Sequence, residues 1–361
     1  MRSFKRSLTS RQEGFYKAKQ FHIPLDEISG AVRRPYSRFP VAYGQGLDSE
    51  LPHLTPLGKL VTLFVLRAYA ELDAGQTDQA LADVETVFRI ENSIKDEPLA
   101  VSQLVRITML AQVQPVVWEG LEAHRWTDAQ IVILQKDLAN TNLPEGMQLS
   151  FRGERASFNV SVAQMTVRTE NGENEGAKLK RIVPNGIFRH MQLNVNLYYD
   201  RYLFNAVDLP GRRIRKDVII AGEERLAQMR PNYFLGLPVF NPYNILTLIW
   251  APVYSSVAVK FACEQSMTDL ALVACALERY RLANGRFPGS LAQLVPKYLN
   301  AIPPDVVRGE QPIYRLNADG TYLLYEKGWN GNDNGGKVIE KPDGKGIDTK
   351  KSDWVWSPKP L

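Results

Sequence analysis

The sequence predicts a mainly α-helical protein that ends in a small α+β unit. From residue 55 onward, apolar side chains recur at helical spacing, with capping residues before the runs and glycine after them. After residue 285 the pattern changes to short alternating runs separated by turn residues. The composition is 44% hydrophobic and 23% charged, as in folded globular proteins, and 361 residues are enough for two or three domains.

We expect three parts: a basic extended arm at 1–54, a helical domain at 55–265 and an α+β head at 266–361. The first 50 residues contain nine basic and five acidic side chains, so they carry +4 of the net charge of +5. Their proline, glycine and arginine residues follow no sustained period, which predicts an extended or poorly ordered segment. The rest of the chain is nearly neutral, which disfavours nucleic acid as a partner.

The helical domain begins with a predicted helical hairpin. Thr55 and Pro56 are typical of an N-cap and a first helical position, and Gly75 ends the apolar run. A second amphipathic run starts at Thr77. The segment RAYAELDAGQTDQALADVETVFRI resembles a single tetratricopeptide-type unit. No second copy follows at a period near 34 residues, so we expect an irregular helical domain and not a regular array.

Later helices are expected at four places: 98–123 with a break or kink near Pro115, 128–139 capped by Thr127, 187–207 and 217–229. Three polar segments between them are interpreted as exposed: the loop 169–180, an ion-paired turn at 152–155 and the basic loop 211–216. The most hydrophobic stretch, 244–262, contains Pro252 and Lys260, so we interpret it as a buried helix and not as a membrane span.

The final third predicts one long helix packed on a small antiparallel sheet. The helix is expected at 267–284 and stops at Asn284-Gly285. A hairpin is expected from the runs 312–316 and 321–325, joined by Asn-Ala-Asp-Gly, and a last strand at 353–356. Helix and sheet together give an α+β unit.

Few residues suggest covalent chemistry. Cys263 and Cys275 are twelve positions apart in one predicted helix, about 18 Å at 1.5 Å per residue, so they cannot pair there and are expected to be buried, inert thiols. The four histidines lack the spacing of a zinc site, and no nucleotide-binding glycine loop or serine-nucleophile motif occurs. Sequence reasoning assigns no catalytic residue. The alternative is an uncharacterised hydrolase with a carboxylate-based site near Glu154 in the helical domain.

The runs ALERYRLANGRFPGSLAQLVPKYLNAIPPD, PIYRLNADGTYLLYEKG and WNGNDNGG carry a resemblance. Residues 267–356 are similar to the globular head of the type II secretion major pseudopilin, in which a long helix precedes a small sheet and a calcium-binding loop. Pseudopilins start with a basic leader and an apolar helix, which is found neither at Met1 nor before Met267. We therefore expect a pseudopilin-like head joined to a helical domain.

Three further segments are SQLVRITMLAQVQPVVWEGL, RGERA and the ending SDWVW. With them, the chain from about residue 56 is also similar to a family of uncharacterised bacterial proteins, whose members usually carry an N-terminal membrane anchor. This resemblance implies a location in the cell envelope or periplasm and a membrane contact through an anchor that this chain lacks. The N-terminus is basic, but no apolar region of a secretory signal follows, so a cytoplasmic location stays open.

The resemblance also implies a bound Ca²⁺ in the C-terminal loop. Its implied side-chain ligands are Asn330, Asp333, Asp348 and Asp353. An EF-hand that starts at Asn330 would place Lys341 where a bidentate glutamate is needed, so that loop type is excluded. Asn330 replaces an aspartate of the family and should weaken binding. The alternative is that these residues form tight turns without a metal.

The expected function is a non-enzymatic structural or protein-interaction protein, linked to secretion or the cell envelope, with protein partners and a calcium-stabilised loop. The oligomeric state stays open. A third hypothesis is a nucleic-acid or anionic-lipid binder that uses residues 1–38 and the basic loop 211–216.

Overall fold

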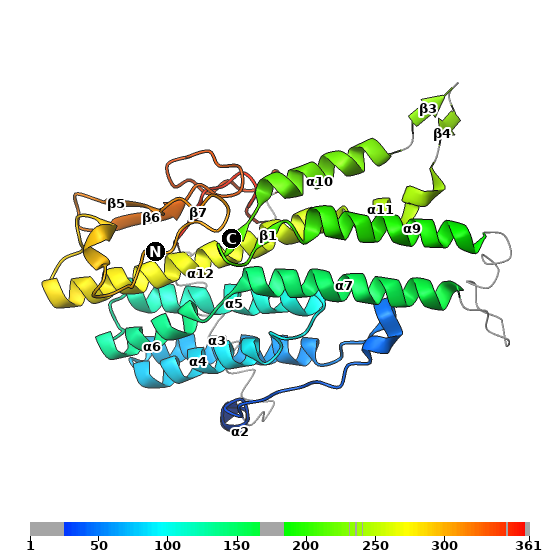
Figure 1. Cartoon of the computed structure of the whole chain (residues 1–361). Coiled ribbons are helices and arrows are strands. Elements are labelled where there is room, and N and C mark those ends of the chain that lie inside the picture. The colour runs from blue at the N-terminus through cyan, green and yellow to red at the C-terminus, as the bar shows by residue number, and fades with distance from the viewer. Residues whose placement is uncertain are drawn as a thin grey trace.

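A computed structural model describes residues 25–166, 184–230, 232–234, 237–239, 241–343 and 346–357. For residues 165–166, 232–234 and 237–239 the description covers the backbone alone. The protein is mainly helical, at 61% helix, with a small antiparallel sheet near the C-terminus (Figure 1). Residues 1–24 of the N-terminal arm and the expected loop 169–180 lie outside the described residues.

From Leu54 onward, helices of 6 to 32 residues account for most of the described chain. They are α3 (Leu54–Asp73), α4 (Thr77–Asn92), α5 (Ala100–Glu122), α6 (Asp128–Ala139), α7 (Leu143–Thr166), α9 (Asn185–Tyr198), α10 (Lys216–Met229), α11 (Ile245–Trp250) and α12 (Val253–Asn284). The starts at Thr77 and Thr127 are confirmed, the latter by a capping box in which Gln130 is the reciprocal partner. The stop at Gly285 is also confirmed, since its φ of 74° is the left-handed cap that favours glycine.

Two details of the predicted helices were wrong. α3 begins at Leu54, so Thr55 lies inside the first turn and is not the N-cap; the amide of Leu57 already donates to the carbonyl of His53. The expected surface turn at 152–155 is the middle of α7. Gly153 marks a close contact between backbones there, because an added Cβ would lie 1.5 Å from the carbonyl oxygen of Pro98.

The described part of the arm is fixed to the helices, which corrects the expectation of a poorly ordered segment. It contains α2 (Leu25–Ala31) and the 3-10 helix η1 (Tyr43–Asp48). Arg67 of α3 lies 3.0 Å from Asp26, and the amide of Leu47 donates to Ser161 Oγ of α7 at 2.9 Å. These contacts hold the arm across α3 and α7.

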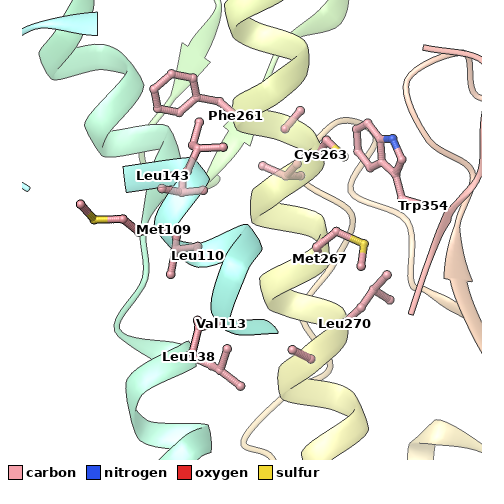
Figure 2. Packing of buried hydrophobic residues seen from close by; sticks show 14 of the residues in the cluster. Met109, Leu110, Val113, Leu138, Leu143, Phe261, Cys263, Met267, Leu270 and Trp354 are labelled. Carbon is pink, nitrogen blue, oxygen red and sulfur yellow. The ribbon is translucent and has the colours of Figure 1, made fainter. Parts of the chain in front are cut away.

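α12 is the central helix of the molecule, and side chains on both of its sides are buried. On one side, Phe261 points toward Leu143 at the start of α7; on the other, Cys263 and Met267 point toward Trp354 of the C-terminal sheet (Figure 2). The helix continues through residue 265, the expected domain boundary, and one apolar cluster extends from Leu54 to Trp356. Helices and sheet therefore share a core.

The C-terminal sheet has the predicted antiparallel order. Strand β5 (Ile313–Leu316) pairs with β6 (Tyr322–Glu326), which pairs with β7 (Trp354–Val355). The register places Tyr314 opposite Leu324 and Tyr325 opposite Val355. The predicted hairpin and last strand are thus confirmed.

Shorter elements complete the description. They are the π-helical turn η2 (Tyr199–Leu203), the hairpin of β1 (Val207–Asp208) and β2 (Arg213–Ile214), the hairpin of β3 (Asn232–Phe234) and β4 (Leu237–Val239), and the 3-10 turns η3 (Pro242–Asn244) and η4 (Leu291–Leu294). The predicted helix 187–207 therefore ends earlier than expected, and a small hairpin follows it.

One helical stretch of the described chain, Pro242–Asn284, is long and apolar enough to cross a membrane by length and composition alone. Core helices of folded proteins pass the same test, and most of α12 between Tyr254 and Glu278 is buried within this fold. The stretch 244–262, expected to form one buried helix, is divided between α11 and the start of α12, and α11 buries only Thr247, so the expectation was wrong for this first part.

Unusually for a core helix, α12 also buries polar side chains. Gln114 of α5 donates to Glu264 at 2.8 Å, and Gln265 accepts the amide of Leu143 at 2.8 Å. Burial raises the pKa of Glu264 to about 8 and that of Asp269 to about 6. Since a buried polar group must find a partner inside the protein, these side chains determine which elements pack around α12.

Candidate functional site

A cavity lies where α12 ends, at the left in Figure 1. It has a volume of about 410 Å³ and opens between the end of α5, the end of α12 and the hairpin β5–β6. We call it the seam cavity, because the helical part and the C-terminal sheet both line it. Pockets of this size commonly hold small molecules or side chains of a partner.

A buried carboxylate forms the charged floor of the seam cavity. The side chain of Glu278 is 3% exposed and accepts two hydrogen bonds from Arg281, each at 2.8 Å. His124 Nδ1 lies 3.0 Å from the same carboxylate. The hydrogen bonds to Glu278 hold the pKa of Arg281 above its usual value. Glu278 is therefore neutralised by partners within the protein.

The backbone of His124 has a conformation that glycine usually supplies. Its φ is 53°, and it follows the end of α5. Its amide donates to Leu121 and the next amide, of Arg125, donates to Gly120, which is the pattern of a Schellman cap. A non-glycine residue in this conformation destabilises the backbone locally. Histidine at this position nevertheless places an imidazole beside Glu278.

Aromatic rings form the opposite wall of the seam cavity. Phe287 and Tyr322 meet edge to face, with ring centroids 4.9 Å apart. Tyr314 packs behind them, 5.9 Å from Tyr322, and donates its hydroxyl to the carbonyl of Pro288 at 2.8 Å. Burial raises the pKa of Tyr322, so this wall stays neutral at ordinary pH. Trp118 and Trp356 line other parts of the cavity.

The mouth of the cavity carries exposed charges of both signs. Glu122 and Arg286 line it and are exposed, and no ion pair of either one occurs in the described part of the chain. The described lining residues include no serine, cysteine or lysine. An aromatic wall with unpaired charges at the rim is suited to binding a short peptide segment or an aromatic ligand.

The basic segment 211–216 attaches the helical part to the C-terminal part, which corrects its interpretation as a solvated loop. Arg212 donates to the carbonyl of Thr141 at 2.6 Å and lies 3.3 Å from Asp269 of α12. Arg213 donates to the carbonyl of Val307 at 3.1 Å, and Lys216 to that of Asn330 at 3.3 Å. Only Arg215 of the four basic side chains is exposed.

The four side chains implied as calcium ligands all lie in the loop between β6 and β7 or at its end. Asp353 is buried and accepts the amides of Asn334 at 3.0 Å and Gly336 at 2.8 Å. Burial raises its pKa. Asp333 accepts the amide of Gly335 and the hydroxyl of Tyr325, both at 2.9 Å, and these hydrogen bonds lower its pKa.

Asn330 and Asp348 also form hydrogen bonds within the loop. Asn330 accepts the amide of Asn332 and donates to the carbonyl of Lys351, both at 2.9 Å. Asp348 accepts the amide of Lys350 at 3.1 Å. Across the described residues, no three His, Cys, Asp or Glu side chains are grouped so that they could hold a metal ion. All four side chains thus close the loop through hydrogen bonds, and the calcium site stays a prediction.

The two cysteines, which the sequence analysis also considered, are buried within the fold, and Glu154 caps a helix. Cys263 and Cys275 are buried and unpaired as expected, and burial raises the pKa of both thiols. Glu154 accepts the amide of Ala100 at 2.9 Å, so its carboxylate caps the start of α5. Burial raises the pKa of Glu154. Glu154 does not line the seam cavity.

Sequence reasoning missed two groups. The first is the seam cavity, whose residues come from distant parts of the chain: His124 and Glu278 are 154 positions apart, and no local motif joins them. The second is Glu326 on β6, which is 2% exposed and takes a hydrogen bond from no described side chain other than that of Ser266. Burial and the nearby Asp305 raise its pKa well above the usual value. One sequence signal was available: side chains alternate between the two faces of a strand, and this alternation places Glu326 on the same face as the buried Leu324.

The hydrogen bonds of the loop between β6 and β7 lead to a prediction about stability. Replacing Asp353 by alanine leaves the amides of Asn334 and Gly336 without their acceptor, and we expect the free energy of unfolding to fall by about 3 kcal/mol. Asp319 is the matched control, because it accepts the amide of Thr321 in an exposed turn. Urea denaturation of both alanine variants measures the difference. Equal, small losses would show that Asp353 does not organise the loop.

Comparison of the chain with protein-family models, with curated proteins and with solved structures gave no match.

Proposed function

We propose that this chain is a non-enzymatic protein-interaction protein that binds a short segment of a protein partner in the seam cavity. One observation carries the proposal: the cavity joins an aromatic wall, made by Phe287 and Tyr322, to a rim with the unpaired charges of Glu122 and Arg286. Aromatic side chains and arginine are the residues that contribute most at protein interfaces. The two rim charges would select the orientation of the bound segment.

The polar floor supports binding in preference to catalysis. Glu278 is held by Arg281 and His124, so its charge is used within the protein. A histidine beside a carboxylate can act as a general base, but the described lining offers no serine or cysteine nucleophile for it to activate. The hydrolase alternative has less support still at Glu154, whose carboxylate caps α5.

The proposal includes the cell envelope as the location and a Ca²⁺ ion in the loop 330–353, with Asn330, Asp333, Asp348 and Asp353 as its side-chain ligands. Its support is the resemblance of residues 267–356 to a pseudopilin head. One long helix that leads into a three-stranded antiparallel sheet and a Gly/Asp-rich loop is compatible with that resemblance. The helical hairpin α3–α4, with its tetratricopeptide-like sequence, would serve as scaffold.

Peptide selection tests the binding site directly. Random dodecapeptides displayed on phage are selected against the purified chain, and the affinity of each enriched peptide is measured by fluorescence anisotropy. Leu316→Trp places a bulky ring at the cavity, so we expect it to weaken these peptides at least tenfold. Val132→Trp on α6 is the control, since Val132 and Leu316 are 43% and 45% exposed. Failure to enrich any peptide, or equal effects of both variants, would contradict the proposal.

The calcium site has its own test, which does not depend on the cavity. If Ca²⁺ binds the folded loop, excess CaCl₂ raises the melting temperature relative to EGTA, because a ligand that binds only the folded state stabilises it. The Asp333→Asn and Asp348→Asn variants should show a smaller rise. Identical melting in CaCl₂ and EGTA would mean that hydrogen bonds alone close the loop.

A further inference from the structure

The end of the molecule opposite the seam cavity exposes apolar side chains. Among the described residues, four aliphatic side chains are more than half exposed: Ile249 at 67%, Val253 at 56%, Val101 at 54% and Leu193 at 51%. Three of the four, all except Val101, belong to α9, α11 or the first turn of α12. Single exposed apolar residues are ordinary, but a group of this kind marks an interaction surface.

Contacts between α9 and η3 hold these neighbouring elements together. The rings of His190 and Tyr243 lie 4.9 Å apart. Asn194 donates to the carbonyl of Tyr243 at 3.0 Å and to the side chain of Asn244 at 3.1 Å. Tyr243 itself is 38% exposed, so an aromatic ring joins the aliphatic side chains. We call Leu193, Tyr243, Ile249 and Val253 the apolar end.

The sequence around the apolar end is free of carboxylates. No aspartate or glutamate occurs between Glu224 and Glu264, a stretch in which the average composition of the chain would place about four. None occurs between Glu175 and Asp200 either. Both stretches contain basic residues, and Arg189 and Arg230 are exposed. The segments that carry the apolar end are therefore apolar and basic, and the nearby carboxylate of Glu223 on α10 accepts the hydroxyl of Ser255.

The backbone at this end projects from the body of the protein. α10 extends away from α9 and α11, and the hairpin β3–β4 lies beyond its end, at the upper right of Figure 1. The strands of this hairpin have the sequences Asn-Tyr-Phe and Leu-Pro-Val, which are mostly apolar.

We propose that the apolar end docks this protein onto the surface of a membrane that contains anionic lipid. Segments that lie in a bilayer interface combine exposed aliphatic and aromatic side chains with lysine or arginine. Anionic headgroups attract the basic residues of these segments. The same charge disfavours a second copy of this chain as the occupant, since two basic ends would face each other. The contact is peripheral, because α12 is the buried core helix.

Vesicle co-sedimentation measures the proposed contact. The full chain is mixed with vesicles of phosphatidylcholine alone or with 30% phosphatidylglycerol, and we expect binding to the anionic vesicles. The double variant Ile249→Glu with Val253→Glu should lose this binding at least tenfold, since it places two charges in the apolar end. Arg189→Gln and Arg230→Gln should each weaken it about fivefold.

The matched control is Val101→Glu with Val132→Glu, which adds two charges at exposed valines of α5 and α6. It should bind as the unmodified chain does, and circular dichroism of all variants checks that they fold. No binding to anionic vesicles, or equal loss in both double variants, overturns the proposal. The proposal is also overturned if the chain self-associates without lipid and the double variant at 249 and 253 abolishes that self-association. The surface would then bind a second copy of the chain.

A fluorescent label gives a second readout that requires no charge substitution. Ile249→Cys carrying the polarity-sensitive dye NBD should brighten when anionic vesicles are added, because the dye enters a less polar medium. The same dye on Val101→Cys should not change. Both native thiols are buried and so are poor targets for labelling. Equal responses at the two positions would contradict membrane docking through the apolar end.

Discussion

The fold depends on the burial of a helix that carries polar as well as apolar side chains. A purely apolar α12 could pack against any apolar surface, but Glu264, Gln265 and Asp269 require particular partners. Gln114 of α5, the start of α7 and Arg212 of the basic segment supply them. Helices from the first half of the chain are therefore positioned against α12 by hydrogen bonds as well as by packing, and the C-terminal sheet packs on its other side.

The two proposed interaction surfaces follow from the length of α12. Its C-terminal end supplies Glu278 and Arg281 to the seam cavity, and its first turn supplies Val253 to the apolar end. A membrane bound at one end would leave the seam cavity at the other end open to a protein partner (Figure 1). The loop closed by Asp353 supports the sheet whose aromatic side chains form one wall of that cavity.

Local signals predicted much of the fold. Thr127, Gly285 and the turn at 317–320 gave correct boundaries, because caps and tight turns depend on neighbouring residues. The candidate site was not predictable in this way, since His124 and Glu278 meet only through tertiary packing. Gly153 and Arg212 were misinterpreted for a related reason: glycine and arginine are typical of exposed turns, whereas here they serve close contacts between helices and between the two parts of the chain.

The pH dependence of stability tests the central role of α12 most directly. Burial raises the pKa of Glu264 from 4.5 to about 8, so the folded state keeps a proton that the unfolded state has lost, and the free energy of unfolding falls as pH rises from about 4.5 to 8. The slope of the free energy of unfolding against pH, measured by urea denaturation from pH 5 to 8, gives the number of protons released on unfolding. This number should fall by about one in Glu264→Gln and stay unchanged in Glu145→Gln, whose side chain is exposed. An unchanged slope in Glu264→Gln would contradict the account.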